Sequence, residues 1–322
     1  MEKVEVVALS AASIDIVLKV DHLPGNDQKV VGTHIGDIPG GTIANFACAI
    51  SRFGLKTGWI GQVGDDREGQ LLLEDFIRFN VDTKYVTIEP GKKTNFTVIL
   101  IDHSGEKSIV VVPTIKTPAD LTPLQKNYIK QARLLYAAPY DLDYFIKATS
   151  FAQENKTLVC TDLEDNSALN RDNVARVLKL ADLVIFNRDG FINIYGEHAL
   201  FDQEIFTETA KEIIDYGVKL MAVSMGSNGC LLVNPTTQLN IPAIKVKVTD
   251  TTGAGDCFNA ALVYGYLKKW DLASTGIFAN AAAALAITAY GARGNLPDPT
   301  TVLNFCRENN IESKGGKNRN DN

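Results

Sequence analysis

The chain has 322 residues, of which 45% are hydrophobic and 22% are charged, a composition typical of globular proteins that excludes the disordered, collagen-like and disulfide-rich classes. Its 32 basic residues against 38 acidic ones give a formal net charge of −6 without any basic block, so we expect neither nucleic acid nor a membrane surface as a partner. The five widely spaced cysteines indicate free thiols. Glu2 and Glu5 stand where a secretory leader would carry basic and then apolar residues, so we expect a cytoplasmic protein.

Short apolar, β-branched runs alternate with segments of helical periodicity along most of the chain. Strands are predicted at residues 4–9, 57–63, 134–137, 157–160, 183–186 and 220–223. Helices are predicted at residues 43–53, 68–79, 122–131, 143–154, 170–180, 206–216, 255–268, 272–290 and 300–308. This alternation predicts a mostly parallel sheet with helices on both faces.

Two segments, residues 19–35 and 81–112, break the alternation. The second contains strand-like runs at 94–101 and 107–112 on either side of Gly105, a pattern typical of a hairpin. We therefore expect a small antiparallel sheet inserted between crossovers of the main one. Residues 309–322 are polar with almost nothing to bury, so the folded domain is expected to span residues 1–308 and to end in a disordered tail.

The segment most informative about chemistry is Gly253-Ala254-Gly255-Asp256, between a strand-like run and an Ala-rich helical run. Small residues at a helix start let backbone N–H groups approach a ligand, and together with the helix dipole they form an anion hole. A carboxylate there would repel a bound phosphate unless it has a chemical task. The task that fits Asp256 is the general base that deprotonates a hydroxyl as it attacks a phosphate. The alternative is that Asp256 only stabilises its helix as a first-turn acid.

A second segment pairs Gly40 and Gly41 with Asn45 one turn into the following helix. It would present N–H donors and a carboxamide to one spot, which suits a ligand rich in hydroxyls. Asp15 follows the first strand, at the edge of a parallel sheet where α/β proteins bind ligands, and could accept hydroxyl hydrogen bonds. Taken alone, the glycine pair is more typical of a plain turn and Asp15 of a turn acid.

Together these segments resemble the two signatures of the PfkB (ribokinase-like) carbohydrate kinase family, with residues 250–256 matching one and residues 40–45 and 61–69 the other. The resemblance extends over residues 4–305 and implies an α/β, ribokinase-like fold with a mostly parallel central sheet, helices on both faces and a small antiparallel β lid. It also implies that the γ-phosphate of ATP is transferred to a carbohydrate hydroxyl, with Asp256 as base and Gly253, Ala254 and Gly255 in the anion hole. In the family, the residues that match Asp15, Gly40, Gly41 and Asn45 hold the sugar hydroxyls.

The same resemblance suggests further ligands. Nucleotide-binding positions correspond to Asn187, Ser224, Gly226, Gly229 and Asn280, and ATP would come with Mg²⁺. Relatives also bind potassium, which makes K⁺ a further candidate cofactor, at positions that correspond to Asp250, Thr252, Ala286, Ala289, Gly291 and Asn295. Lids of relatives such as ribokinase often pair, so the resemblance implies a homodimer through the lid.

Two positions depart from the family pattern. The Asn of the nucleotide strand usually continues as N-x-x-E, with the Glu organising water around magnesium, whereas Asn187 is followed by Gly190 at that place. Asp189 could substitute from one position earlier. Residues 42–43 are Thr-Ile where ribose kinases commonly carry Lys-Gly, so the substrate need not be ribose.

Several functions can be weighed against these motifs. A sugar kinase accounts for both signatures and for Asp256, and a nucleoside kinase of the same family is an open alternative. A non-catalytic sugar or nucleotide sensor is suggested only by Gly190. An NAD-dependent oxidoreductase is rejected, because Phe258 stands where the glycine pattern would need its last glycine. No Walker A motif occurs, which excludes a P-loop kinase.

Overall fold

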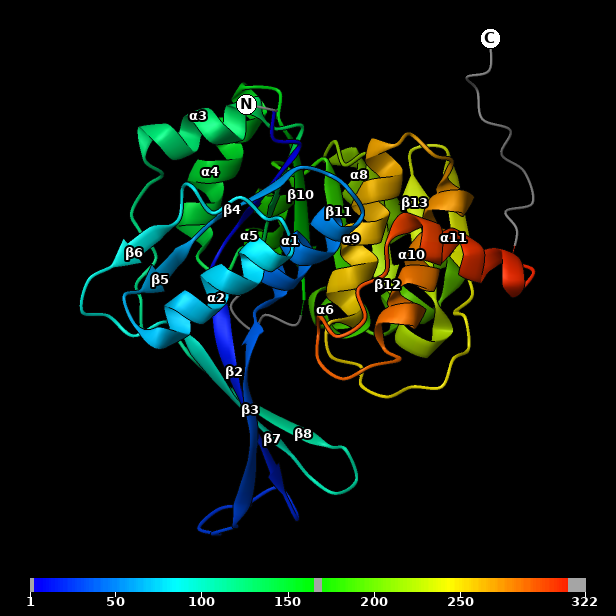
Figure 1. Cartoon of the computed structure of the whole chain (residues 1–322). Helices are drawn as coiled ribbons and strands as arrows, with labels where there is room; N and C mark the ends of the chain where they lie inside the picture. Colours follow the sequence, from blue (N-terminus) through cyan, green and yellow to red (C-terminus); the bar gives the residue numbers. More distant parts are fainter. Residues whose placement is uncertain (1–2, 165–169, 312–322) are drawn as a thin grey trace.

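Eight strands form the central sheet of this computed structural model, which describes residues 3–164 and 170–311 (Figure 1). They are β1 (Val6–Leu9), β4 (Thr57–Ile60), β9 (Leu134–Ala137), β10 (Leu158–Leu163), β11 (Leu183–Asn187), β12 (Leu220–Ser224), β13 (Cys230–Asn234) and β14 (Thr237–Ile241). Their order is β14–β13–β12–β11–β10–β9–β1–β4. The strands from β12 to β4 run parallel, and β13 and β14 extend the sheet as antiparallel strands.

Helices cover both faces of this sheet, and side chains that alternate along each strand fill two separate cores. One face carries α1 (Thr42–Arg52), α2 (Arg67–Arg78), α9 (Ala254–Leu267), α10 (Leu272–Ala286) and α11 (Pro299–Glu308). The other carries α3 (Pro123–Gln131), α4 (Leu142–Glu154), α5 (Arg171–Leu178), α6 (Arg188–Tyr195), α7 (His198–Phe201) and α8 (Gln203–Asp215). In β1, Val6 and Ala8 belong to the first core and Val7 to the second, as the pleat requires.

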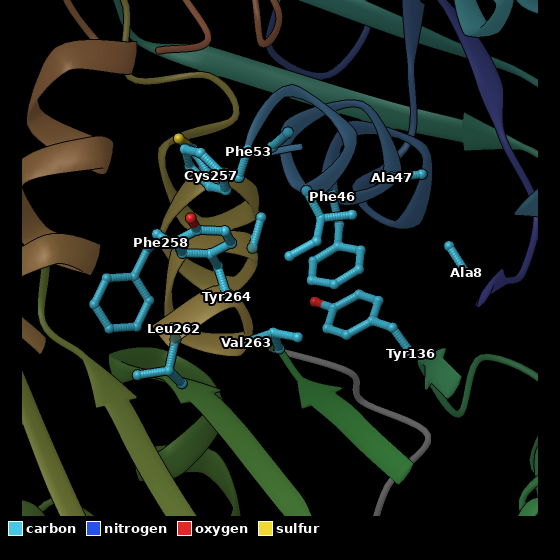
Figure 2. Packing of buried hydrophobic residues seen from close by; sticks show 14 of the residues in the cluster. Ala8, Phe46, Ala47, Phe53, Tyr136, Cys257, Phe258, Leu262, Val263 and Tyr264 are labelled. Carbon is cyan, nitrogen blue, oxygen red and sulfur yellow. The ribbon is translucent and has the colours of Figure 1, made fainter. Parts of the chain in front are cut away.

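The first core fixes α1 and α9 against the middle of the sheet. Figure 2 shows Phe46 of α1 over Tyr136 of β9, with Leu262 and Val263 of α9 close by. The rings of Phe46 and Tyr136 are stacked, with centroids 3.5 Å apart and 4° between their planes. Most of α9 is buried, so its packing holds the first turn of α9 in place beside the first turn of α1.

A second sheet of four strands projects from the main body (Figure 1). It is formed by β2 (Ser13–Val20), β3 (Gly32–Gly40), β7 (Phe96–Ile101) and β8 (Lys107–Val112), in the order β3–β2–β7–β8. We call this sheet the lid. Its β2–β3 and β7–β8 pairs are antiparallel, whereas β2 and β7 run parallel. A separate short pair joins β5 (Gln62–Gly64) to β6 (Thr87–Glu89).

The predicted fold class is confirmed, and every predicted strand and helix of the main body is present within a few residues. The lid boundaries differ from the expected ones: its first arm spans residues 13–40 instead of 19–35, and of residues 81–112 only β7 and β8 join it. Strand β3 is exposed over most of its length, so it lacks the hydrophobic alternation that marks a strand in sequence.

Two helices, α6 and α7, were not predicted from the sequence. Helix α6 follows β11 without an intervening loop, and Asn187, the last residue of that strand, is also its N-cap. Helix α10 ends at Ala286 and not at residue 290. Of the expected tail, residues 312–322 lie outside the described residues. Within the described ranges, no helix combines the length and apolarity needed to cross a membrane.

Candidate active site

Helix α9 begins in the segment for which the sequence predicts an anion hole. Gly253 occupies the N-cap position with φ 78°, a left-handed conformation, and a Cβ at this position would lie 2.6 Å from Ala292. No side chain caps the start of the helix, and the space around Gly255 is open. The first backbone N–H groups of α9 therefore present the positive end of a helix of 14 residues to whatever binds there.

Asp256, in the first turn of α9, is held by Asn45 of α1. The carboxamide nitrogen of Asn45 donates to Asp256 Oδ2 over 2.7 Å, and the Asn45 side chain is itself buried. No other hydrogen bond from the described residues reaches the carboxylate of Asp256. One carboxylate oxygen is thereby fixed by the protein, and Oδ1 is left to accept a proton from a ligand.

Arg293 determines which way the Asn45 carboxamide points. Its Nε donates to Asn45 Oδ1 over 2.9 Å and one terminal nitrogen to the carbonyl of Gly40 over 3.3 Å, while the other terminal nitrogen pairs with the carboxylate of Asp75 in α2. Because Asn45 Oδ1 accepts from Arg293, its nitrogen must face Asp256. Arg293 and Asp75 were not singled out in the sequence, where 218 positions separate them without any recognisable motif.

The surroundings of Asp256 adjust its basicity. Burial and, after it, the negative charge of Glu164 raise the pKa of its carboxyl, whereas the Asn45 hydrogen bond and the Arg293 charge lower it and Asp15 adds a small upward shift. Together these effects raise the pKa of Asp256 to about 7. A carboxylate with a pKa near neutrality is a far better proton acceptor than an exposed one, and this is the range in which a general base works at physiological pH.

Two more acids lie beside Asp256 at the carboxyl end of β10. Asp162 Oδ2 accepts from the hydroxyl of Tyr136 over 3.0 Å and from Asn259 Nδ2 over 2.7 Å, and burial raises the pKa of Asp162 well above its usual value. Glu164 follows the strand, and burial raises its pKa as well. The sequence analysis missed both acids, although their place directly at the carboxyl end of a parallel strand was a usable signal.

Asp15 lies in lid strand β2, opposite the end of β3, and is buried against Gly40. A Cβ on Gly40 would lie 2.1 Å from Asp15 Oδ2, so only glycine permits this approach. Ser13 Oγ donates to Asp15 Oδ1 over 3.3 Å, and burial raises the pKa of Asp15. Gly41 is the N-cap of α1 and has φ 94°. The structure thus brings Asp15, Gly40, Gly41 and Asn45 together where α1 begins, next to the first turn of α9.

The residues expected at the nucleotide lie further along the same edge of the sheet. Asn187 and Ser224 are neighbours in the β11–β12 register. Gly229 has φ 89°, and a Cβ there would lie 2.0 Å from the Ile241 carbonyl. The Asn280 carboxamide donates to the carbonyls of Ile241 (3.1 Å) and Pro242 (3.0 Å), so it ties α10 to the end of β14. Gly226 begins a short 3₁₀ turn with open space around it.

Residue 190, where the family pattern N-x-x-E has its glutamate, has no room for a carboxylate side chain that could organise water around magnesium. A Cβ on Gly190 would lie 2.4 Å from the carbonyl of Leu163 and 2.8 Å from the carbonyl carbon of Glu164, so a side chain cannot be accommodated without moving the backbone. Asp189 is 63% exposed and pairs with Arg188 over 3.0 Å. The Asn187 side chain accepts from the Gly190 N–H over 2.6 Å and so caps α6.

The residues expected at potassium surround the loop between β14 and α9. Asp250 Oδ1 accepts from the Thr252 backbone N–H (3.0 Å) and hydroxyl (2.7 Å), and Oδ2 accepts from the Gly291 N–H over 3.0 Å. Burial alone would raise the pKa of Asp250, but these hydrogen bonds, with one from Lys107 of the lid, lower it to about 2. Asn295 donates to the Leu285 carbonyl and to the Thr288 hydroxyl. Ala286 ends α10, and Ala289 follows in the loop that leads to Gly291.

A cavity of about 80 Å³ lies at the carboxyl ends of β1, β4 and β9, next to the residues expected to bind the sugar. Tyr140 lines it. The polar part of its wall is formed by Ser10, Gln62, Thr87, Asn95, Gln125 and Asp141. This volume is enough for a few water molecules or a small substituent of a ligand held by Asp15.

Comparisons with known proteins identify the family of this chain. The family described as pfkB family carbohydrate kinase matches residues 1–299. An uncharacterized sugar kinase of Archaeoglobus fulgidus is 29% identical over 252 residues, covering 77% of this chain and 98% of its own. A 5-dehydro-2-deoxygluconokinase of Clostridium botulinum is 25% identical (95% and 94% covered), and the ribokinase of Bacillus subtilis is 28% identical (91% and 96% covered).

Solved structures show the same fold. The structure of Arabidopsis thaliana ribokinase complexed with ribose and ATP has a TM-score of 0.83 at 23% identity, covering 95% of this chain and 99% of its own. The nucleoside kinase of Methanocaldococcus jannaschii has a TM-score of 0.78 at 20% identity, covering 96% and 100%. The fold and the site define an α/β phosphotransferase. The chain belongs to the pfkB family of carbohydrate kinases and is an ATP-dependent kinase with an alcohol acceptor.

Proposed function

We propose that Asp256 is the general base of a sugar kinase reaction, in which a hydroxyl of a carbohydrate attacks the γ-phosphate of ATP. The observation that carries the proposal is the hydrogen bond from Asn45 to Asp256 Oδ2 at the uncapped start of α9. It leaves Asp256 Oδ1 as proton acceptor, directly beside backbone N–H groups suited to an anion. A first-turn acid that only stabilised its helix would have no need of a buried partner from α1.

The reaction would then proceed by positioning and charge stabilisation. The acceptor hydroxyl donates its proton to Asp256 Oδ1 as its oxygen bonds to the γ-phosphorus, and the bond to the leaving oxygen of ADP breaks. The N–H groups of Gly253 and Gly255 stabilise the negative charge on the transferring phosphoryl group. The N–H of Ala254, which the family resemblance also places in the anion hole, instead donates to the carbonyl of Thr251 over 3.2 Å. Magnesium bound to ATP would neutralise charge on the phosphates, and we assign no side chain to it, because residue 190 offers none.

The charges around the acceptor favour a neutral sugar. Four acids, Asp15, Asp162, Glu164 and Asp256, lie at or next to the site; Asp162 is buried and the other three are half-buried. Of the cations nearby, Arg293 already uses its nitrogens on Asn45, Gly40 and Asp75, and Lys107 is bound to Asp250 and Thr252. Carboxylates accept hydrogen bonds from hydroxyls and repel other carboxylates, so a pentose or hexose fits better than a sugar acid.

A nucleoside remains the second candidate substrate. The cavity next to the acceptor residues, with Tyr140 in its wall, lies where a substituent larger than a hydroxyl would extend from the sugar. A non-catalytic sensor is disfavoured, because a sensor would gain nothing from the tuned basicity of Asp256.

We further propose that the protein is a homodimer through its lids. Edge strand β8 exposes Ile109 (57%), Val110 (55%) and Val111 (69%), and edge strand β3 exposes Ile35 (56%). Unpaired sheet edges with apolar side chains are suited to pairing with a second copy. Sedimentation velocity should show a dimer that Val111→Lys converts to a monomer, whereas Ile77→Lys on α2 should not; a monomeric wild type would contradict the proposal.

The proposed activity is tested by a screen for ATP consumption with magnesium present. Neutral pentoses and hexoses, sugar acids and nucleosides are offered separately, and Asp256→Asn is assayed in parallel. We expect phosphorylation of a neutral sugar by the wild type and loss of the signal in the variant. ATP binding without turnover of any acceptor would overturn the kinase assignment in favour of a sensor, and a sugar acid as the best acceptor would overturn the charge argument.

A further inference from the structure

A lysine of the lid reaches the loop that leads into the anion hole. Lys107 is the first residue of β8, and its Nζ lies 3.0 Å from Asp250 Oδ1 and 2.7 Å from Thr252 Oγ1. In Figure 1 the β7–β8 hairpin diverges from the β2–β3 arm of the lid toward the side of the molecule that carries α9. Since Thr252 directly precedes Gly253, the ammonium group lies next to the start of α9. This contact joins the sheet that covers the acceptor to the loop that would hold the phosphate.

The pair is sheltered enough for its charge to matter. The Lys107 side chain is 27% exposed and that of Asp250 is 17% exposed. Nearly every acceptor position of the Asp250 carboxylate is used, by Thr252 and Lys107 at Oδ1 and by the Gly291 N–H at Oδ2. A carboxylate in this setting needs one compensating positive charge, and the ammonium of Lys107 supplies it.

The same arrangement does not fit the potassium ion expected at these residues. A potassium site requires several oxygens that converge on one point. Here Asp250 faces N–H and ammonium donors, and Gly291 turns its amide to Asp250. Asn295 turns its nitrogen to Leu285 and Thr288, so its donors serve the loop itself. One positive charge is already in place, on the side chain of Lys107.

We propose that the ammonium group of Lys107 serves as the built-in monovalent cation of this loop, so that the kinase does not depend on potassium. The proposal builds on the sugar kinase activity proposed above. Because Lys107 belongs to the lid, the charge reaches Asp250 only when the lid lies over the main body. When the lid closes over the sugar, Lys107 therefore also compensates the charge of Asp250 beside the phosphate. In this way sugar binding is coupled to the formation of a site that can transfer the phosphoryl group.

The first test compares cations at constant ionic strength. The initial rate of the wild type should be the same within about twofold in potassium, sodium or choline chloride. Lys107→Met should lose about tenfold or more in choline chloride, the size of effect expected for a charged hydrogen bond, and should regain activity in potassium chloride. Lys19→Met, on lid strand β2, is the matched control and should behave as the wild type. A wild type that needs potassium, or a Lys107→Met loss that potassium does not restore, overturns the proposal.

A second measurement does not depend on turnover. The melting temperature of Lys107→Met should be higher in potassium chloride than in choline chloride by about 2 °C or more, because a ligand that binds only the folded state stabilises it, and that of the wild type should not differ. If Lys107→Met does not fold, Lys107→Gln is used. A wild type stabilised by potassium overturns the proposal even if no acceptor is found. Absence of any kinase activity would instead contradict the proposed function.

Discussion

Asn45 Nδ2 lies 2.7 Å from Asp256 Oδ2, although the two residues are 211 positions apart. The contact joins the first turns of α1 and α9, the two helices that the sequence signatures mark separately. It gives the acidic residue a fixed orientation and a definite free oxygen. The following predictions depend on this pair and on the residues around it.

Replacing the base tests the proposed mechanism directly. Asp256→Asn keeps the shape of the side chain and should leave the fold and ATP binding intact, but kcat should fall by at least about a hundredfold, since general-base assistance is typically worth 10² to 10⁴. Steady-state kinetics and nucleotide titration measure the two properties separately. Asp189→Asn, at an exposed aspartate of α6, serves as control. Near-normal turnover of Asp256→Asn would rule out its role as base.

The rate should depend on pH in the way expected of a buried carboxylate. The base acts when deprotonated, and burial raises the pKa of Asp256 to about 7. In the substrate-free enzyme, kcat/KM should therefore rise with pH and level off above a midpoint near 7 instead of near 4. A plateau that extends unchanged down to pH 5 would show that the carboxylate is not the titrating base.

Removing the partner of the base should shift this midpoint. The hydrogen bond from Asn45 lowers the pKa of Asp256, so Asn45→Ala should move the midpoint to higher pH and decrease kcat/KM by about tenfold or more at pH 7. Asn304→Ala, in α11, is the matched control. An unchanged midpoint together with a raised KM for the sugar would mean that Asn45 binds the acceptor and does not orient the base.

Arg293 should act through Asn45 and through its charge. Arg293→Gln removes a positive charge that lowers the pKa of Asp256, so the midpoint should again move to higher pH. The variant also leaves the largely buried carboxylate of Asp75 with only a 4.0 Å contact to Arg78, which should lower stability. The double variant Arg293→Gln with Asp75→Asn should recover stability but not the midpoint. Recovery of both, measured by thermal unfolding and pH profiles, would reduce Arg293 to a structural role.

Gly190 should be intolerant of any side chain. Gly190→Ala brings a Cβ within 2.4 Å of the Leu163 carbonyl, which belongs to a central strand and cannot move freely. We expect a loss of about 1–3 kcal/mol in the free energy of unfolding, measured with urea, despite the higher helix propensity of alanine. Gly36→Ala in lid strand β3, where the nearest atom is 3.8 Å away, is the control. Equal stability of Gly190→Ala would show that α6 shifts to make room.

The sequence by itself determined the features that depend on neighbouring residues. The alternation of apolar runs predicted the main sheet and its helices, and the small residues 253–255 indicated the start of α9, for which an anion hole is predicted. The same segment predicted Asp256 as the general base, because a carboxylate beside a phosphate site is unfavourable unless it has a chemical task. The expected positions of Asp15, Gly40, Gly41 and Asn45 rested on a second local pattern and on the family resemblance.

Only the tertiary structure decided how the site is held together. Asn45 faces Asp256 because Arg293 occupies its other end, and Lys107 meets Asp250 because the lid hairpin folds back over the main body. The basicity of Asp256 likewise comes from its burial and from Glu164, which lies 92 positions earlier in the chain. These contacts join segments whose closeness depends on strand order and helix packing. Side-chain charge and hydrogen bonding act over a few ångströms in space, and local sequence patterns carry no record of such distances.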